Sequence, residues 1–309
     1  IPEKRMYRHK KWNKTLKIDS IIEILQNVSD KRLDEIRKEI SNKESILIHT
    51  AEKGGVFDKT HTDMVLGAIR DNKSPSRPET LNKLLLQLIS SAFSYNRVRN
   101  QLKRINNSKF NRNYFPVGED HKRLLGYLLN DERFEDEDYW HPVRFEALLE
   151  EIKHHRKYEA VNELTPYWLG YILDILGTAP SKLIEITNLN VNEFYRKVDD
   201  ICNQDFNDDI FFKSEVLWRM ATDFSIGIKN VGPNLMCDFL KESGFTDYAK
   251  MDVHMIRSIS EVLQINQDDK LADYESFATT QWLANKMNMT PYRLDKIFYV
   301  YGVYRKAFQ

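Results

Sequence analysis

The chain has 309 residues, of which 41% are hydrophobic and 12% aromatic, the composition of a folded protein with one or two domains. No run approaches the roughly 18 consecutive apolar residues of a membrane span, and we expect no signal peptide ahead of the fold. Two distant cysteines exclude a disulfide framework and fit a reducing cytoplasm.

The formal net charge is zero, which at face value argues against nucleic-acid binding, but the charges are unevenly spread. Residues 1–17 and 97–112 are rich in Lys and Arg, whereas residues 131–138 are acidic. A cationic stripe can bind phosphates while an acidic face points away, so a neutral chain can still bind DNA. Arg97 and Lys103 are the candidate contacts, and an ordinary solvated face is the alternative.

Apolar residues recur at helical spacing over residues 18–48 and predict helices there. Residues 73–78 contain two prolines and two serines and form the clearest linker signal. We therefore divide the chain into an N-terminal basic and helical extension, residues 1–75, and a main domain, residues 76–309.

Beyond the linker, a long helical pattern runs from Glu79 to about Arg104, with an interruption near Ser94. Alternating strand patterns are nearly absent, so the predicted fold class is all-α. The further predicted helices are residues 119–130, 141–154, 165–177, 180–187, 191–202, 212–224, 234–243, 252–263, 273–287 and 291–306.

Residues 225–255 carry the most information. A tight turn is predicted over residues 229–233, because Asn230 and Gly232 are residue types that tolerate positive φ. Pro233 favours the first turn of a following helix. Such a turn leaves backbone amides at a helix N-terminus, a geometry that binds phosphate. The alternative is a helix–turn–helix that only packs.

This segment resembles the helix-hairpin-helix plus Gly/Pro-Asp signature of the DNA glycosylase superfamily that includes endonuclease III. In that family a Leu-Pro-Gly-Val-Gly hairpin is followed by a helix, a loop and a Val-Asp-Thr-His-Val segment. Here Ile-Lys-Asn-Val-Gly stands at 228–232 and Met-Asp-Val-His-Met at 251–255, without a gap in their separation. A weaker resemblance covers residues 84–98 and 289–302.

The resemblance implies two helical subdomains flanking a DNA-binding cleft, with Asp252 as the catalytic acid. It also implies that the hairpin contacts DNA and that its carbonyl groups hold a monovalent cation; no other cofactor is expected. The hairpin DNA contacts would be Lys229, Asn230, Gly232 and Asn234, and the carbonyl groups those of Ile228, Asn230 and Val231.

Departures from the family pattern narrow the chemistry. Bifunctional members carry a lysine where this chain has Asn234, and a Schiff base with the sugar requires a primary amine. An iron–sulfur cluster needs four closely spaced cysteines, so none is expected. No metal site is predicted, because the adjacent His154 and His155 would point in different directions on a helix. His254 is expected to pack rather than to act as a base.

The base pocket is less well marked. The glutamine of the family helix is replaced here by Ala92 or Phe93, so its base-reading role does not carry over. Candidates for the pocket or the wedge are Phe93, Tyr95 and Asn96, with Trp168 and Tyr171 weaker. An aromatic residue in a helix is more often a core residue than a pocket residue. An insertion within residues 130–200 relative to compact glycosylases either shapes the pocket, binds a partner or adds packing.

The sequence therefore predicts a monofunctional DNA glycosylase that hydrolyses the N-glycosidic bond of a damaged or modified base flipped out of duplex DNA. A bifunctional glycosylase/lyase using Lys229 or Lys250 and an inactive DNA-binding module are the alternatives. The expected partner is double-stranded DNA and no membrane. We expect a monomer in the cytoplasm, associated with the nucleoid when bound to DNA.

Overall fold

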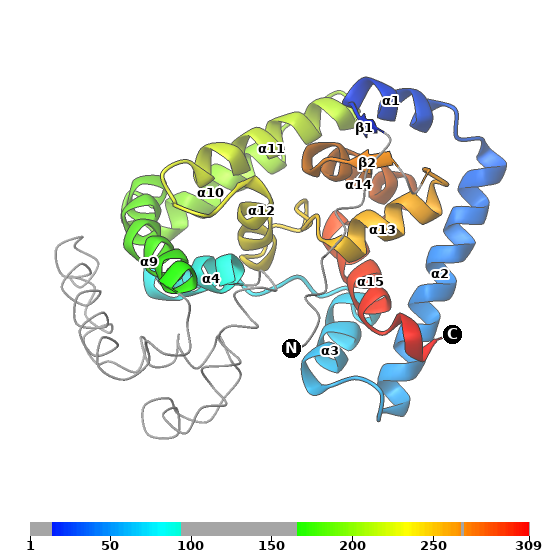
Figure 1. Cartoon of the computed structure of the whole chain (residues 1–309), viewed down its shortest axis with the longest axis horizontal. Coiled ribbons are helices and arrows are strands. Elements are labelled where there is room, and N and C mark those ends of the chain that lie inside the picture. The colour runs from blue at the N-terminus through cyan, green and yellow to red at the C-terminus, as the bar shows by residue number, and fades with distance from the viewer. Residues whose placement is uncertain (1–13, 94–165, 267–268, 309) are drawn as a thin grey trace, which may run out of the picture. The chain divides into compact units, whose positions relative to one another are not determined.

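The computed structural model describes residues 14–93, 166–266 and 269–308 (Figure 1). Among the sequence-derived candidates, Tyr95, Asn96, Arg97 and Lys103 lie outside these residues, as does most of the predicted insertion. Phe93 and Trp168 are placed only as positions on helices α4 and α9.

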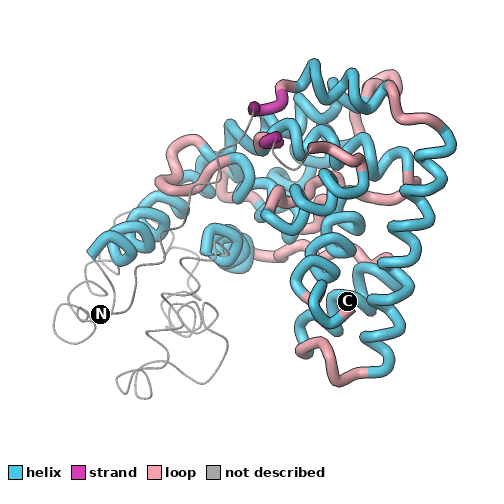
Figure 2. Tube along the Cα trace, turned by 45° about the vertical axis from the view of Figure 1, so that its right-hand side comes forward, coloured by secondary structure: helices cyan, strands magenta, loops and turns pink. Residues whose placement is uncertain are grey.

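The described residues are mostly helical, which confirms the all-α prediction. The exception is a pair of short parallel strands, β1 (Lys14–Leu16) and β2 (Asp269–Leu271), in which Thr15 lies opposite Lys270 (Figure 2). Three residues are too few for the period-2 alternation that marks a strand in a sequence. None of the described helices combines the length and apolarity that a membrane crossing requires.

The chain divides into two compact units. One, here called the terminal unit, combines residues 1–73 with residues 249–309. The other, the central unit, spans residues 74–248. The N-terminal helices therefore share a core with the C-terminal helices, and Lys73, where the linker begins, is the last residue before the change of unit.

In the terminal unit, α15 packs against α2, η1, α13 and α14. Its buried Leu294, Ile297 and Phe298 lie at helical spacing, as do Ile36 and Ile40 of α2. The elements are α1 (Ile18–Gln26), α2 (Asp30–Lys53), α3 (Lys59–Met64), the π-helical turn η1 (Val65–Arg70), α13 (Val253–Val262), α14 (Asp273–Lys286), α15 (Pro291–Val303) and the 3₁₀ turn η4 (Arg305–Ala307).

The helices predicted over residues 18–48 are confirmed as α1 and α2. Ser29 separates them, because its side chain accepts a hydrogen bond from Arg32 N and caps α2. The sequence analysis assigned no helix to residues 59–70, where the structure has α3 and η1. Both are only six residues long, which is too short for a helical period to be recognised.

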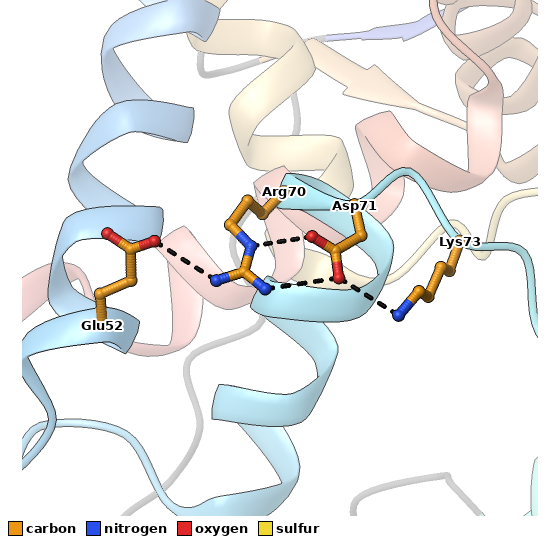
Figure 3. Close-up of polar contacts among 4 residues, drawn as sticks. All are labelled: Glu52, Arg70, Asp71 and Lys73. Carbon is orange, nitrogen blue, oxygen red and sulfur yellow. Dashed lines mark hydrogen bonds and ion pairs between the residues drawn. The ribbon is translucent and has the colours of Figure 1, made fainter.

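A network of hydrogen bonds and ion pairs joins four charged residues at the end of η1 (Figure 3). The guanidinium of Arg70 donates from Nε to Asp71 Oδ1 at 2.8 Å and from Nη1 to Glu52 on α2 at 3.4 Å. Lys73 Nζ lies 3.2 Å from Asp71 Oδ2. Hydrogen bonds from Arg70 and Lys73 lower the pKa of Asp71. Such exposed pairs contribute little stability one by one, so the network adds only a small local stabilisation at the end of η1.

In the central unit, α12 packs against α4 and α11, and α9 packs against α4 and α10. The ring of Phe194 lies about 6 Å from those of Phe224, Phe239 and Phe245, and together they form an aromatic core. The elements are α4 (Leu81–Phe93), α9 (Pro166–Thr187), α10 (Val191–Cys202), α11 (Ile210–Ser225) and α12 (Pro233–Glu242).

One predicted helix boundary, between residues 177 and 180, was wrong. The sequence predicts separate helices at 165–177 and 180–187, because a proline ordinarily ends a helix. The structure has a single helix, α9, with Pro180 buried in its interior. A proline there removes one backbone hydrogen bond, at a cost of roughly 3 kcal/mol. The helix persists because it packs on two neighbours, and tertiary contacts of this kind override local propensity.

The linker at residues 73–78 has no helix or strand, as its composition indicates, but Arg77 anchors it through several contacts. The Arg77 guanidinium makes two hydrogen bonds to the carboxylate of Asp199, at 2.7 and 2.6 Å. It also lies over the rings of Tyr195 and Phe245, about 5 Å from each centroid. A lysine would lose the two-pronged geometry, since only guanidinium matches a carboxylate in this way.

Gly244 follows α12 and must remain a glycine. Its φ is +96°, and a Cβ there would lie 2.8 Å from Arg77 Cγ and 3.2 Å from Pro75 O. We expect Gly244→Ala to lower the free energy of unfolding by about 1–3 kcal/mol, from backbone strain and displacement of the Arg77 anchor. Urea unfolding followed by circular dichroism measures this.

Gly67 provides the matched control for Gly244. It lies inside η1, and a Cβ there meets no atom within 4 Å. Gly67→Ala should leave stability unchanged or raise it by about 0.5–1 kcal/mol, because alanine loses less conformational entropy in a helix. Equal destabilisation by the two variants would contradict this account of Gly244.

Candidate functional site

The turn between α11 and α12 has the predicted position. Helix α11 ends at Ser225, and α12 begins at Pro233 with Gly232 as its N-cap residue. Within the turn, Ile228 N donates to Ser225 O at 3.1 Å, and Val231 N donates to Ile228 O at 3.3 Å. The turn is therefore closed by its own backbone.

The backbone angles confirm the positive φ expected at Asn230 and do not show one at Gly232. Asn230 has a φ of +63°, the left-handed conformation that its residue type tolerates. Gly232 has a φ of −101°, which any residue can adopt, and a Cβ there would meet no atom within 4 Å. Gly232 therefore does not use the positive φ that its residue type tolerates, and a side chain there would not clash with the turn. The position that needs a glycine is Gly227, at φ +94°, which the sequence analysis did not identify.

Helix α9 braces the turn through three polar residues. Thr178 Oγ1 accepts a hydrogen bond from Lys229 N at 3.0 Å, and the Tyr171 hydroxyl donates to Asn230 O at 3.2 Å. Asp174 Oδ1 lies 3.4 Å from the Lys229 ammonium. The sequence analysis missed this role. A signal for it existed, because positions 171, 174 and 178 share one face of a helix that is otherwise largely apolar.

These contacts and the backbone bonds of the turn alter the expectations for three of the hairpin residues, Ile228, Lys229 and Asn230. The backbone amide of Lys229 is used by Thr178, and its ammonium has a carboxylate beside it. The carbonyl of Asn230, one of the expected cation ligands, already accepts a hydrogen bond from the Tyr171 hydroxyl. The carbonyl of Ile228 accepts a hydrogen bond from Val231 N. A carbonyl oxygen has a second lone pair, so the cation remains a prediction.

The N-terminus of α12 has no side-chain cap. Gly232 has no side chain that could accept from the first amides, and Pro233 has no N–H to satisfy. The first backbone bond of the helix is Met236 N to Gly232 O at 3.1 Å. Among the described residues, the amides of Gly232 and Leu235 make no hydrogen bond. Unpaired donors at the positive end of a helix dipole attract anions.

Asp252 is the N-cap residue of α13. Its Oδ1 accepts hydrogen bonds from His254 N at 2.8 Å and from Met255 N at 2.9 Å. Its own amide donates to Lys250 O at 3.0 Å. Oδ2 makes no hydrogen bond or ion pair with any residue that the structure describes. The carboxylate is thus oriented through one oxygen while the other remains available.

His254 packs against α15, as expected for a structural residue. A Cβ on Gly302 would lie 2.6 Å from His254 Nδ1 and 2.8 Å from its Cβ, so the imidazole fills the space that this glycine leaves. The ring also meets Tyr299 edge-on, with centroids 5.9 Å apart. The start of α13, and with it Asp252, is therefore fixed to α15.

Lys250, the alternative lyase residue, lies in the same fixed segment. Its backbone N–H donates to the buried Asp295 Oδ1 at 3.3 Å.

Both cysteines are buried thiols, and burial raises the pKa of Cys202 to about 12. Among the described residues, no three His, Cys, Asp or Glu side chains gather as metal ligands.

The two candidate elements belong to different units: the turn to the central unit and Asp252 to the terminal unit. Each is held by contacts within its own unit, the turn by α9 and the start of α13 by α15. No protein-family model, curated protein or solved structure matches the chain. These residues and the spacing of the two motifs are therefore the features from which a function can be inferred.

The cap at Asp252 can be tested independently of any activity. We expect Asp252→Ala to lower the free energy of unfolding by about 1 kcal/mol, because two amides of α13 lose their acceptor. Asp252→Asn should cost much less, since asparagine is an equally good N-cap residue. Chemical denaturation of the two variants measures the difference. Equal losses would mean that the capping bonds do not stabilise α13.

Proposed function

We propose that the protein is a monofunctional DNA glycosylase that releases a damaged or modified base from duplex DNA. The observation that carries the proposal is the Asp252 carboxylate, anchored by Oδ1 and available at Oδ2, at the family spacing from an uncapped helix N-terminus. In this proposal the turn and α12 form the helix-hairpin-helix element, which binds the DNA backbone.

The chemistry requires a fixed negative charge. Breaking the N-glycosidic bond builds positive charge on the deoxyribose, as in other reactions with an oxocarbenium-like transition state. A carboxylate beside the sugar stabilises that charge and can polarise a water molecule for attack. Asp252 fits this task because its orientation is set before substrate arrives, so little reorganisation is needed.

The backbone amides at the start of α12 would hold DNA phosphate. Phosphate contacts position a protein on the duplex without reading its sequence. This suits an enzyme that must examine many sites, and the bound backbone supports extrusion of the target nucleotide, which costs roughly a few kcal/mol. The absence of a capping side chain at Gly232 keeps this surface open to phosphate.

A DNA-binding module without catalysis is the second candidate, and one observation favours it. Capping of α13 by itself gives Asp252 a structural role. An acid retained only for its cap would leave base release unaffected when it is neutralised without loss of the cap.

The Asp252→Asn variant separates these two functions, because it keeps the cap and removes the charge. Under the glycosylase proposal we expect single-turnover base release to fall by about 100-fold or more. DNA affinity should stay within a few fold of wild type or improve. The substrate is chosen from a panel of duplexes that each contain one damaged or bulky modified base, scored for abasic sites.

Asp209→Asn is the matched control for this experiment. Asp209 caps α11 with the same geometry, because its Oδ1 accepts from Phe211 N at 3.0 Å and Phe212 N at 2.9 Å. The Asp209→Asn variant should retain base release. If Asp252→Asn also retains the wild-type rate, Asp252 is not the catalytic acid and the binding module is favoured.

The phosphate site can be tested by giving α12 a cap. We expect Gly232→Asp to maintain or raise stability, because aspartate caps at least as well as glycine and its Cβ has open space. DNA binding should weaken, and the slope of log affinity against log salt should fall by about one unit. Fluorescence anisotropy over a salt series measures both quantities.

Gly232→Asn is the control for added charge, because it caps α12 without introducing a carboxylate. It should weaken binding less than Gly232→Asp but in the same direction, since it occupies the same amides. Unchanged affinity and salt slope in both variants would show that DNA phosphate does not bind at the start of α12.

The reaction should stop at an intact abasic site. Asn234 has no primary amine, so no Schiff base with the sugar can form there. We expect strand breaks only after hot alkali, and no covalent enzyme–DNA adduct on borohydride treatment. An adduct that disappears in Lys250→Gln or Lys229→Gln would instead establish the bifunctional alternative and identify its lysine.

A further inference from the structure

A second charged site lies in the terminal unit, where α13 meets the end of α15. A pocket of about 400 Å³ opens there, within the roughly 300–1,000 Å³ typical of ligand sites. Its lining includes Arg257 of α13 and Arg305 and Lys306 of η4. The proposed mechanism uses none of these residues. Figure 1 shows α13 beside α15, with the chain end following α15.

The charge balance in the pocket is positive. Arg305 is paired with Glu261 at 2.7 Å. Arg257 and Lys306 are exposed and have no ion pair among the described residues. The end of α15 contributes the negative pole of its helix dipole, equivalent to about half an elementary charge. Two unpaired cations exceed that charge, so the pocket favours an anion.

The pocket walls are held in place. Tyr304 lines the pocket, and its hydroxyl lies 3.2 Å from His61 Nδ1 and 3.4 Å from Asp58 N. Gly302 lines it too, and the packed imidazole of His254 fills the space beside this glycine. The same contact that orients the start of α13 therefore shapes one wall of the pocket.

The pocket lies close to Asp252 along the same helix. Arg257 follows Asp252 by five positions, which is roughly 7.5 Å of helix rise. Base pairs in DNA are spaced by about 3.4 Å, so this separation corresponds to roughly two steps. Five positions also turn the helix by about 140°, so the two side chains leave α13 on different faces. The long side chain of Arg257 must therefore extend around the helix to contact a neighbouring phosphate of a strand whose target sugar meets Asp252.

We propose that this pocket binds a backbone phosphate of the substrate DNA, within about two nucleotides of the base that is released. The inference rests on the glycosylase function proposed above and assigns it a second phosphate contact, in the unit that holds Asp252. Arg257 and Lys306 supply the charge, and the Arg305–Glu261 pair borders the site.

The test uses the full chain and a double variant, Arg257→Gln with Lys306→Gln. The salt slope of duplex binding should fall by about one unit per lost phosphate contact, with a several-fold loss of affinity. Arg257→Lys, which keeps the charge, should restore much of the slope.

Lys31→Gln with Lys38→Gln is the matched control. Both lysines are exposed on α2 of the same unit and have no ion pair among the described residues. If the pocket variant and this control have the same affinity and salt slope, the pocket does not bind DNA and the proposal is overturned. A lower slope in the pocket variant alone supports it.

Neutral methylphosphonate linkages, placed one at a time around the target nucleotide, locate the phosphate. Replacing the phosphate that occupies the pocket should abolish the difference between wild type and the double variant. If no linkage within two nucleotides of the target does so, the proposed location is wrong. Loss of base release in Asp252→Asn is scored separately, so failure of the pocket and failure of the glycosylase proposal give different results.

Discussion

The capping bonds of Asp252 are the interaction on which the candidate site depends. One carboxylate oxygen accepts hydrogen bonds from two backbone amides of α13, and these bonds fix the direction of the other oxygen. In the proposed reaction a freely rotating carboxylate would have to be ordered as the reaction proceeds, whereas a capping carboxylate is ordered when the protein folds. The packing of His254 against Gly302 then ties the start of this helix to α15. Capping and electrostatic stabilisation are compatible in one residue because they use different oxygens.

Unlike α13, which Asp252 caps, α12 has no side-chain cap at its N-terminus. The shape of the turn before α12 is maintained from outside by Thr178 and Tyr171 of α9. Each such hydrogen bond contributes roughly 1 kcal/mol, while the exposed pair of Lys229 and Asp174 contributes roughly 0–1 kcal/mol. Neutral hydrogen bonds, rather than the ion pair, therefore hold the turn. The amides of Gly232 and Leu235 make no hydrogen bond among the described residues, because Thr178 and Tyr171 contact the turn earlier in the sequence, at Lys229 and Asn230.

The terminal unit brings three features onto two helices. Helix α13 supplies Asp252 at its start and Arg257 beyond it, and α15 supplies the glycine on which His254 packs. Because α13 and α15 pack together, a change at Gly302 would affect the carboxylate and the basic pocket at once. A substrate strand that meets both would be held by charge beside the reacting sugar, which raises local concentration without adding to the chemistry.

The sequence by itself determined the helical class, most helix positions and the turn at residues 229–233, because helical periodicity and turn chemistry are local properties. It also placed Asp252 at the beginning of a helix, residues 252–263, but its capping role was found only in the structure. Tertiary structure decided the rest. Pro180 stays inside α9 because packing offsets its cost, and β1 pairs with β2 across more than 250 residues. The braces at Tyr171, Asp174 and Thr178, the His254–Gly302 contact and the pocket at Arg257 and Lys306 all join segments distant in sequence. Local propensity has no information about such pairs, because they form only when packing brings the segments together.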